Sequence, residues 1–331
     1  MIEKHRDLSK GLAAAAARHM GEAISIEELK RLAGGAVAET WAFDLLRPGK
    51  REKLVLRLSR GEPLSAMYVD RATEAGVQHA AYEAGVPAPG VRFILDERDG
   101  MGTGYAMERV EGETIARRIL RDEAFAAVRP AMARQCGEIL ARIHAVATSR
   151  LPELAELDAE SQVRHHRAIY ESFGNFHPVF ETAFRWLDDH LPLKTAPRLV
   201  HGDFRNGNFV VGPEGIRAVL DWELTHLGDP MEDLGWVCVN SWRFGNIDLP
   251  VGGFGSREDM FKGYEAAGGE PVDRERVRFW EVFGSLKWGI ITLIQGFTHL
   301  KGKVRSVELA AIGRRPSETE LDLLDLIYGE A

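Results

Sequence analysis

The chain contains 331 residues, of which 45% are hydrophobic, and its formal net charge at pH 7 is -8. This length predicts about two domains with enough apolar material for a hydrophobic core, and the acidic balance argues against a nucleic-acid-binding groove. The two cysteines, Cys136 and Cys238, are too few for a disulfide framework, so the composition fits a reducing cytoplasm.

Residues 1–21 combine acidic and basic side chains with a short alanine run. Arg18 and His19 follow that run directly, which is not the pattern of a secretory signal peptide. We expect an amphipathic helix here that ends at Gly21. The most apolar later stretch, Trp288 to Phe297, is too short to span a bilayer and is expected to form a buried helix. These features predict a soluble, cytoplasmic protein without membrane association.

Residues 26–110 favour β-strands, because short apolar runs alternate with turn residues. We expect strands at 29–33, 41–46, 54–58, 91–96 and 105–110. A glycine-containing loop, 34–40, separates the first two strands, and a helix from about Val69 to Ala84 follows the third. A strand, a glycine loop and two further strands are typical of the lobe that covers the nucleotide in kinases, although most glycine loops are only turns.

Beyond Glu113 the pattern becomes helical. A helix over 131–146 places a set of apolar residues on one face. His144, near the end of this helix, is expected to be a packed core histidine. Residues 151–194 hold the pair His165-His166 and an aromatic-rich run. No other ligand lies at metal-site spacing from this pair, so we favour a helical insertion with a packed aromatic face.

The next segment, 199–221, predicts a β-hairpin that brings candidate catalytic and metal-binding side chains together. The strand 198–200 enters a tight loop containing Asp203 and Asn208, and the turn at 212–215 returns the chain so that Asp221 lies beside that loop. Phosphoryl transfer needs this set of side chains. One carboxylate orients or deprotonates the incoming hydroxyl, and a carboxylate and an amide oxygen hold Mg²⁺ against the nucleotide phosphates.

His201, Asp203 and Asn208 fall at the spacing of the H-R-D-x-x-x-x-N loop of protein kinases, and Asp221 stands in place of the D-F-G acid. These segments resemble the H-G-D-x-x-x-x-N and D-W/F-E segments of the aminoglycoside phosphotransferase family of small-molecule kinases. The chain is similar to the branch of that family that includes kinase domains fused to acyl-CoA dehydrogenases.

This resemblance implies an α+β, bilobal, protein-kinase-like fold. The small, β-rich lobe would span 1–110 and the larger, helical lobe 111–331. ATP would donate its γ-phosphoryl group to a hydroxyl of a small molecule that Asp203 orients, with Mg²⁺ held by Asn208 and Asp221. Arg205, two positions after Asp203, would stabilise charge on the transferred group; the alternative is a surface arginine that anchors the loop.

The resemblance also implies a set of nucleotide-binding residues: Gly34, Gly35, Arg57, Glu74, Glu108 and Val110. Backbone groups of the glycines would contact phosphates, and backbone groups at 108–110 would read the adenine. Arg57 stands where kinases carry a lysine that pairs with a helix glutamate, here Glu74, and an arginine is not a neutral replacement. An exposed strand arginine and a surface helix acid are the alternatives.

Three further residues, His201, Asp229 and Asp233, are expected to be structural, with Asp229 as a helix N-cap and Glu232 completing a capping box. Glu223 either reaches the metal region or only lines the loop. The glycine-rich segment 242–256 lacks the G-x-x-x-x-G-K-[ST] pattern of a phosphate loop. We therefore expect residues 242–244 on the acceptor side of the pocket, with Ser256 capping the next helix.

Two alternatives stay open for the function. The first is a non-catalytic, nucleotide-binding pseudokinase, which Arg57 and the weak glycine loop favour. The second concerns the acceptor, which is an aminoglycoside or else a hydroxyacyl-CoA or another anionic or apolar alcohol. The basic and aromatic residues of 164–186 and 242–244 favour the latter group. Neither nucleic acid nor an obligate protein partner is expected.

Overall fold

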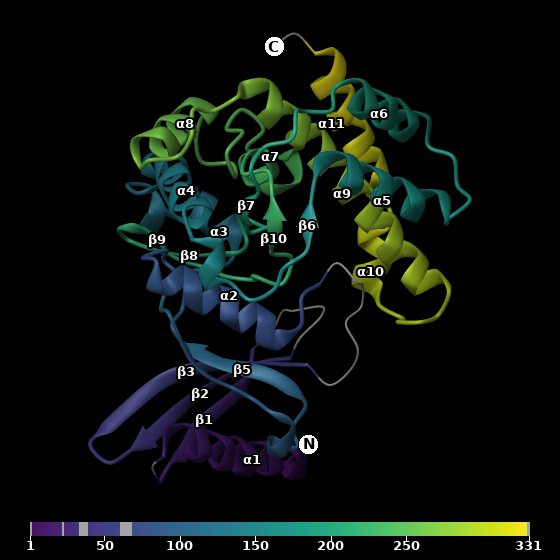
Figure 1. Cartoon of the computed structure of the whole chain (residues 1–331). Coiled ribbons are helices and arrows are strands. Elements are labelled where there is room, and N and C mark those ends of the chain that lie inside the picture. The colour runs from purple at the N-terminus through teal and green to yellow at the C-terminus, as the bar shows by residue number, and fades with distance from the viewer. Residues whose placement is uncertain (1, 22, 33–38, 60–67, 330–331) are drawn as a thin grey trace.

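The computed structural model describes residues 2–21, 23–32, 39–59 and 68–329, and these form two lobes (Figure 1). The small lobe contains a five-stranded antiparallel sheet, and the large lobe is mainly helical. The expected bilobal α+β fold is therefore confirmed. Gly34 and Gly35, for which we expect a role in phosphate binding, lie outside the described residues.

The sheet of the small lobe has the strand order β1-β2-β3-β5-β4. Its strands are β1 (Ser25–Arg31), β2 (Glu39–Arg47), β3 (Lys50–Ser59), β4 (Val91–Ile94) and β5 (Thr103–Glu108). The first strand was expected at 29–33, so its predicted start lies four residues after the observed start of β1 at Ser25. An irregularity between Glu27 and Lys30, where Glu28 has a φ of 51°, breaks the alternation of apolar side chains that a strand prediction depends on.

Two helices cover the sheet. Helix α1 (Ile2–Met20) lies on the outer face and buries Leu8, Leu12, Ala15 and Ala16 against it (Figure 1). Helix α2 (Arg71–Glu83), which Asp70 caps, lies between the sheet and the large lobe. Because α2 is packed on both sides, charged residues on it can reach the junction of the lobes.

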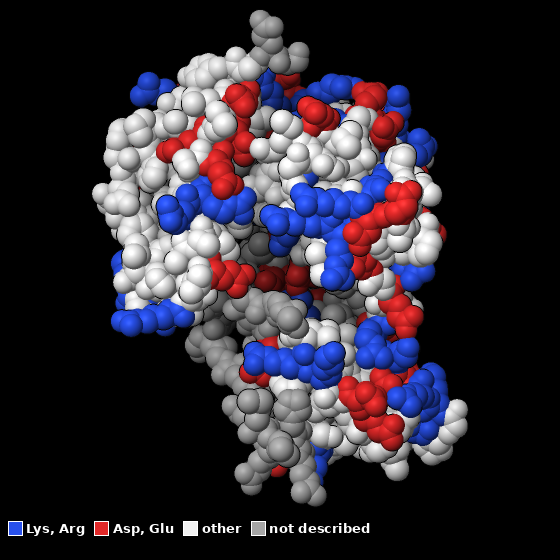
Figure 2. All heavy atoms as spheres, turned by 180° about the vertical axis from the view of Figure 1, so that it is seen from behind, with Lys and Arg blue, Asp and Glu red and all other residues white. Residues whose placement is uncertain are grey.

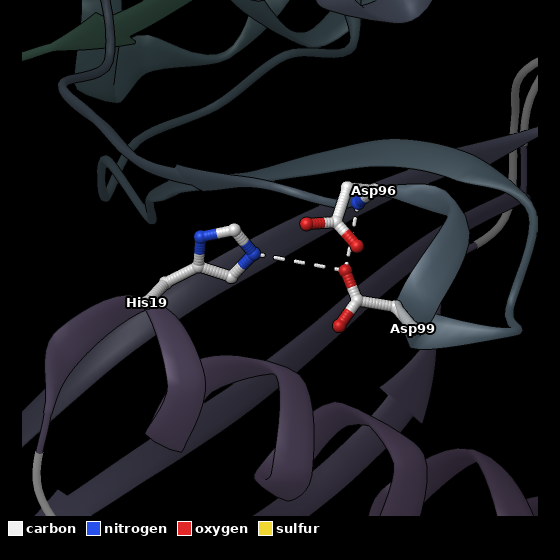
Figure 3. Close-up of side chains that lie close together, drawn as sticks. All are labelled: His19, Asp96 and Asp99. Carbon is white, nitrogen blue, oxygen red and sulfur yellow. Dashed lines mark hydrogen bonds and ion pairs between the residues drawn. The ribbon is translucent and has the colours of Figure 1, made fainter.

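The end of α1 is joined to the turn between β4 and β5 by polar contacts (Figure 3). His19 Nε2 lies 3.6 Å from Asp99 Oδ2, and the N–H of Asp96 donates to the same oxygen at 2.7 Å. Although one histidine and two acids gather here, Arg18 pairs with Asp99 and Arg98 pairs with Asp96. These ion pairs explain why the charged residues gather here: they anchor the N-terminal helix to the turn between β4 and β5.

The large lobe is built on helices around one hydrophobic core. Its helices are α3 (Ala116–Arg121), α4 (Arg129–His144), α5 (Ala159–Glu171), α6 (Pro178–Asp189), α7 (Met231–Trp236), α8 (Arg257–Ala266), α9 (Arg274–Leu300), α10 (Val307–Ile312) and α11 (Pro316–Tyr328). Its short strands are β6 (Glu156–Leu157), β7 (Arg198–Val200), β8 (Phe209–Gly212), β9 (Gly215–Val219) and β10 (His226–Gly228). Strands β8 and β9 form the hairpin expected from the sequence.

Several expected elements appear at or near their expected bounds. Helix α9 covers the stretch expected to be a buried helix, and within the described residues no helix has the length and apolar character needed to cross a bilayer. Ser256 caps α8, as expected. The capping box expected at α7 was wrong. The N-cap position is taken by Pro230 and not by Asp229, although Asp229 accepts the N–H of Met231 at 2.9 Å. Glu232 turns into the core and binds His226 Nε2 at 3.1 Å.

Candidate active site

The loop between β7 and β8, residues 201–208, is fixed by Asp233 of α7. One carboxylate oxygen of Asp233 accepts the N–H of His201 at 2.8 Å, and the other accepts the N–H of Gly202 at 3.0 Å. Gly202 has a φ of 78°, and a Cβ there would lie 2.3 Å from the carbonyl oxygen of Leu224, so glycine is required. His144, at the end of α4, also contacts Asp233 through Nε2 at 3.1 Å.

His201 is fully buried inside this loop. Its Nδ1 accepts the N–H of Asp203 at 3.2 Å, so its Nε2 donates to the carbonyl oxygen of Leu220 at 3.1 Å. Burial lowers the pKa of His201, against the opposing effect of Asp233. A neutral imidazole that uses both nitrogens supports the expected structural role.

Asp203 receives three hydrogen bonds that fix its carboxylate. Oδ1 accepts from Arg205 Nε and from Trp236 Nε1, both at 2.9 Å, and Oδ2 accepts from Asn208 Nδ2 at 2.7 Å. Arg205 in turn lies over the ring of Trp242, with its Cζ 4.5 Å from the ring centroid. The two residues expected to be catalytic are therefore in direct contact.

Asp221 follows β9 and lies at the junction of the lobes. Its φ is 64°, a left-handed conformation that costs free energy in a non-glycine residue and is found mainly at functional sites. Its carboxylate pairs with Arg57 of β3. Burial alone would raise the pKa of Asp221, but Arg57 outweighs this effect and the pKa is lowered.

Arg57 is at the centre of a partly buried ionic network that joins the lobes. Besides Asp221, its guanidinium contacts Glu74 of α2 (Nε–Oε1, 3.3 Å) and Glu223 of the large lobe (Nη2–Oε2, 3.1 Å). Arg71 pairs with both glutamates, at 3.0 Å from Glu223. The expected pairing of Arg57 with Glu74 is thus confirmed, and an exposed position for either residue is excluded.

The acidic partners in this network differ in their proton affinity. Burial raises the pKa of Glu223 to about 7, reinforced by Asp221 and Glu74 and opposed by Arg57. The contacts of Glu223 with Arg57 at 3.1 Å and with Arg71 at 3.0 Å show that it belongs to the network and does not merely line the loop.

The donor set fits a hard cation such as Mg²⁺. Asn208 uses its Nδ2 to bind Asp203, which leaves its carbonyl oxygen as the metal-capable atom. Asp221 supplies a carboxylate, and oxygens of Glu74, Asp221 and Glu223 lie within 4.8 Å of one another. Oxygen ligands of this kind are those that Mg²⁺ prefers.

The hinge residues differ in what their backbones can offer. The N–H of Glu108 donates to the carbonyl oxygen of Gly90 at 2.9 Å, and its side chain binds Arg92 at 2.6 Å. Its N–H is therefore used within the small lobe. In the part of the chain that the structure describes, no hydrogen bond engages the backbone of Val110.

A cavity of about 270 Å³ lies between the lobes. In the space-filling view the surface is hollowed here, with acidic side chains in the hollow and basic side chains around it (Figure 2). Its described lining comprises Thr40, Arg57, Tyr68, Asp203, Arg205, Asp221, Glu223, Leu224, Trp236, Trp242, Trp288, Ile291 and Gln295. The two residues expected to be catalytic, Asp203 and Arg205, thus share one cavity with aromatic residues.

The acceptor side was only partly foreseen. Of the expected residues 242–244, Trp242 lines the cavity, but Arg243 turns away and binds Glu281 at 2.9 Å. No described residue of 164–186 lines it: Arg167 pairs with Asp188, and His166 is buried against the carbonyl oxygen of Gln162. That segment packs as a helical insertion, as expected from the sequence.

Three cavity residues missed by the sequence reasoning come from α9: Trp288, Ile291 and Gln295. Their spacing of three and four residues puts them on one helix face. This spacing was visible in the sequence of the stretch Trp288 to Phe297, which was interpreted only as a buried helix. No neighbouring residue in the sequence indicated that this helix face borders a cavity.

Comparisons with known proteins agree with this geometry. Residues 28–280 match the model of the phosphotransferase enzyme family. Among curated relatives, mouse (Mus musculus) acyl-CoA dehydrogenase family member 10 is 33% identical over 204 residues, covering 56% of this chain and 18% of that protein. Chicken (Gallus gallus) acyl-CoA dehydrogenase family member 11 is 32% identical over 219 residues, covering 61% of this chain and 27% of that protein. The chain spans about a quarter or less of these relatives.

Solved structures share the fold at low sequence identity. A Ralstonia eutropha protein provisionally named an aminoglycoside phosphotransferase has a TM-score of 0.73 and 23% identity, covering 97% of each chain. A choline/ethanolamine kinase family protein from Mesorhizobium loti has a TM-score of 0.62 and 20% identity, covering 92% of this chain and 90% of that one. The aminoglycoside phosphotransferase APH(4)-Ia, in complex with ADP and hygromycin B, has a TM-score of 0.65 and 15% identity, covering 97% and 100%.

Proposed function

The chain belongs to the phosphotransferase enzyme family, and we propose that it is a small-molecule kinase that transfers the γ-phosphoryl group of ATP to an alcohol in a Mg²⁺-dependent reaction. The observation that carries the proposal is the placement of Asp203. Its carboxylate is fixed by three donors at the wall of a cavity that also contains Asp221 and Arg57.

The step consists of one bond exchange. A new bond forms between the acceptor oxygen and the γ-phosphorus, the bond from that phosphorus to the bridging oxygen of ADP breaks, and ADP leaves. Asp203 orients the acceptor hydroxyl and takes its proton, as carboxylates in kinase catalytic loops do. The hydrogen bonds from Asn208 and Trp236 hold the carboxylate in place for this task.

Two further groups manage charge. Arg205 lies 2.9 Å from Asp203 and lines the same cavity, so its guanidinium can stabilise negative charge on the group in transfer. Asn208 and Asp221 would hold Mg²⁺, which when bound neutralises phosphate charge. Arg57, Glu74, Gly34 and Gly35 belong to the proposed nucleotide side, and Val110 to the adenine contact.

The test is Mg·ATP turnover against a panel of alcohols: aminoglycosides, choline-like amines, sugars and hydroxyacyl-CoA thioesters. Asp203→Asn retains the shape of the side chain and removes the base. We expect phosphorylation of one class, with the rate lowered by about 10² or more in the variant, and an unchanged melting temperature as the control for folding. Equal rates in both proteins would contradict the role of Asp203.

A second candidate, a nucleotide-binding pseudokinase, is favoured by one observation. Asp221, the proposed metal ligand, is already paired with Arg57, and a protein that never binds Mg²⁺ there would retain that pair. ATP binding with no phosphorylated product across the panel would favour this candidate over the kinase.

A further inference from the structure

One wall of the cavity is formed by three tryptophans from separate elements. Trp236 ends α7, Trp242 lies in a short 3-10 helix, Asn240–Arg243, and Trp288 comes from α9. The ring centroids of Trp236 and Trp242 are 5.1 Å apart, and those of Trp242 and Trp288 are 4.9 Å apart. With Ile291 and Gln295 these rings face the same cavity as Asp203, so an acceptor bound near that carboxylate meets an aromatic surface.

The acidic residues of the cavity are engaged with arginines. Asp203 pairs with Arg205 at 2.9 Å, Asp221 pairs with Arg57, and Glu223 pairs with Arg57 at 3.1 Å. Among the described residues that line the cavity, no carboxylate lacks a basic partner. A polycationic acceptor would have to displace an arginine from a partly desolvated pair, which is costly.

Two of the aromatic faces already carry a cation. Arg205 Cζ lies 4.5 Å from the ring centroid of Trp242, and Lys287 Nζ lies 4.9 Å from that of Trp236. Aromatic rings also bind ligand ammonium groups by cation–π attraction. Here such a group would compete with two resident cations and would be repelled by them.

Three polar atoms of the wall point to the kind of ligand that fits. The indole Nε1 atoms of Trp242 and Trp288 and the Oε1 of Gln295 are buried without a hydrogen-bond partner. Buried polar atoms are normally paired, and an indole N–H can only donate. Hydroxyl, ether or carbonyl oxygens of an uncharged ligand can satisfy the two indole donors, whereas an ammonium group cannot. Gln295 Oε1 is an acceptor, and a ligand hydroxyl can donate to it.

From these observations we infer that the acceptor is an uncharged alcohol with a largely apolar or planar body that packs against Trp236, Trp242 and Trp288. This inference rests on the proposed function, because it names the acceptor class for the same site. It assigns specificity to the three tryptophans, which hold the body of the alcohol while its hydroxyl meets Asp203.

A matched pair of probes tests the inference: 4-tert-butylbenzyl alcohol and its (4-hydroxymethylphenyl)trimethylammonium analogue, which share a shape and differ by one charge. Binding of each to the full chain is measured by calorimetry with Mg·ADP present, and phosphorylation is measured separately with Mg·ATP. We expect the neutral alcohol to bind at least about tenfold more tightly than the cation.

Variants locate the binding. Trp288→Ala removes a large aromatic contact and should weaken binding of the neutral alcohol about tenfold, whereas Trp288→Phe should weaken it less than about threefold. Trp186→Ala is the matched control, because Trp186 lies on α6 and stacks on His190, outside the cavity lining. The Trp186→Ala variant should bind the neutral alcohol as tightly as the unaltered protein does. Melting temperatures verify that each variant is folded.

The outcomes separate this inference from the proposed function. Binding of the neutral alcohol that depends on Trp288 but gives no phosphorylated product would support the inference and contradict the kinase. Preferential phosphorylation of the cation would support the kinase and overturn the inference. Failure of both probes to bind, or equal binding by Trp288→Ala, would also overturn it.

Discussion

Arg57 contacts three carboxylates at once, and this determines what can replace it. Its guanidinium has several N–H donors in a planar fork, so it can contact Glu74, Asp221 and Glu223 from one position. A lysine offers a single ammonium and cannot span the three in the same way. The arginine thus retains the charge expected on this strand of a kinase and adds a contact with the proposed metal ligand.

Arg57→Met should destabilise the fold and Arg57→Lys should do so less. Removing the cation leaves the buried Glu74 and the partly buried Asp221 and Glu223 without their central partner. The free energy of unfolding should therefore fall by about 3 kcal/mol, as measured by denaturant unfolding. Lys53→Met, on the same strand at an exposed pair with Glu111, is the control and should change little. A similar loss in both methionine variants would contradict the central role of Arg57.

Arg205 is expected to act on the transferred group more than on nucleotide binding. Arg205→Ala should lower kcat about 10²-fold, because it removes a positive charge directed at the developing negative charge. The KM for ATP should stay within about threefold, since Arg205 binds Asp203 and Trp242 on the acceptor side. Steady-state kinetics measures both; an unchanged kcat would reduce Arg205 to a loop anchor.

At the scale of elements, the loop 201–208 depends on α7 and α4. Asp233 receives two backbone N–H groups of the loop and contacts His144, and all of these groups are buried. Burial would raise the pKa of Asp233, but the contact with His144 helps to lower it. The carboxylate therefore couples the loop to the helix behind it.

A double-mutant cycle measures this coupling. Asp233→Ala should lower the free energy of unfolding by about 3 kcal/mol, because it leaves buried donors unpaired. His144→Ala should cost less when Asp233 is absent than when it is present, by a coupling energy of about 1 to 2 kcal/mol. The cost that remains reflects the burial of His144 and its hydrogen bond with Tyr264 at 2.9 Å. Additive effects in the denaturant unfolding of the double variant would show that the two side chains act independently.

A feature could be predicted from the sequence when residues close together in the chain determine it, and could not when it depends on the packing of distant elements. The hairpin 198–221 was predictable because Asp203, Asn208 and Asp221 are arranged by one short turn. The cavity wall formed by Trp236, Trp242 and Trp288 could not be predicted, because these residues meet only after α7 packs on α9. Glu232 was misjudged for the same reason. Its position suits a helix cap, but a buried partner, His226, lies within reach only in the folded lobe.

For the whole molecule, the lobes meet through partly buried charged side chains. Arg57 and Arg71 come from the small lobe, and Asp221 and Glu223 come from the large lobe. The N–H of Val69 also donates to the carbonyl oxygen of Glu223 at 2.9 Å. The junction of the lobes therefore depends on the protonation state of its acids, which makes stability at this junction sensitive to pH.

Glu223 should make stability fall as pH rises towards neutrality. Its pKa is raised to about 7 by burial, with further contributions from Asp221 and Glu74, against an ordinary value of 4.5. Between these values the folded state holds a proton that the unfolded state has released, so the unfolding free energy decreases with pH until Glu223 ionises in the folded state. We expect a contribution of about 2 kcal/mol across this window.

Glu223→Gln isolates this contribution, because glutamine does not ionise. Unfolding by denaturant between pH 5 and pH 8, at about half-unit steps, should show a flatter pH dependence for the variant than for the unaltered protein. His226, whose pKa is raised by Glu232 against the effect of burial, also loses stabilisation as pH rises. Since it is present in both proteins, the difference between the two curves reports Glu223 alone. Parallel curves would mean that Arg57 and Arg71 keep Glu223 ionised throughout, and the junction would then behave as a permanently charged network.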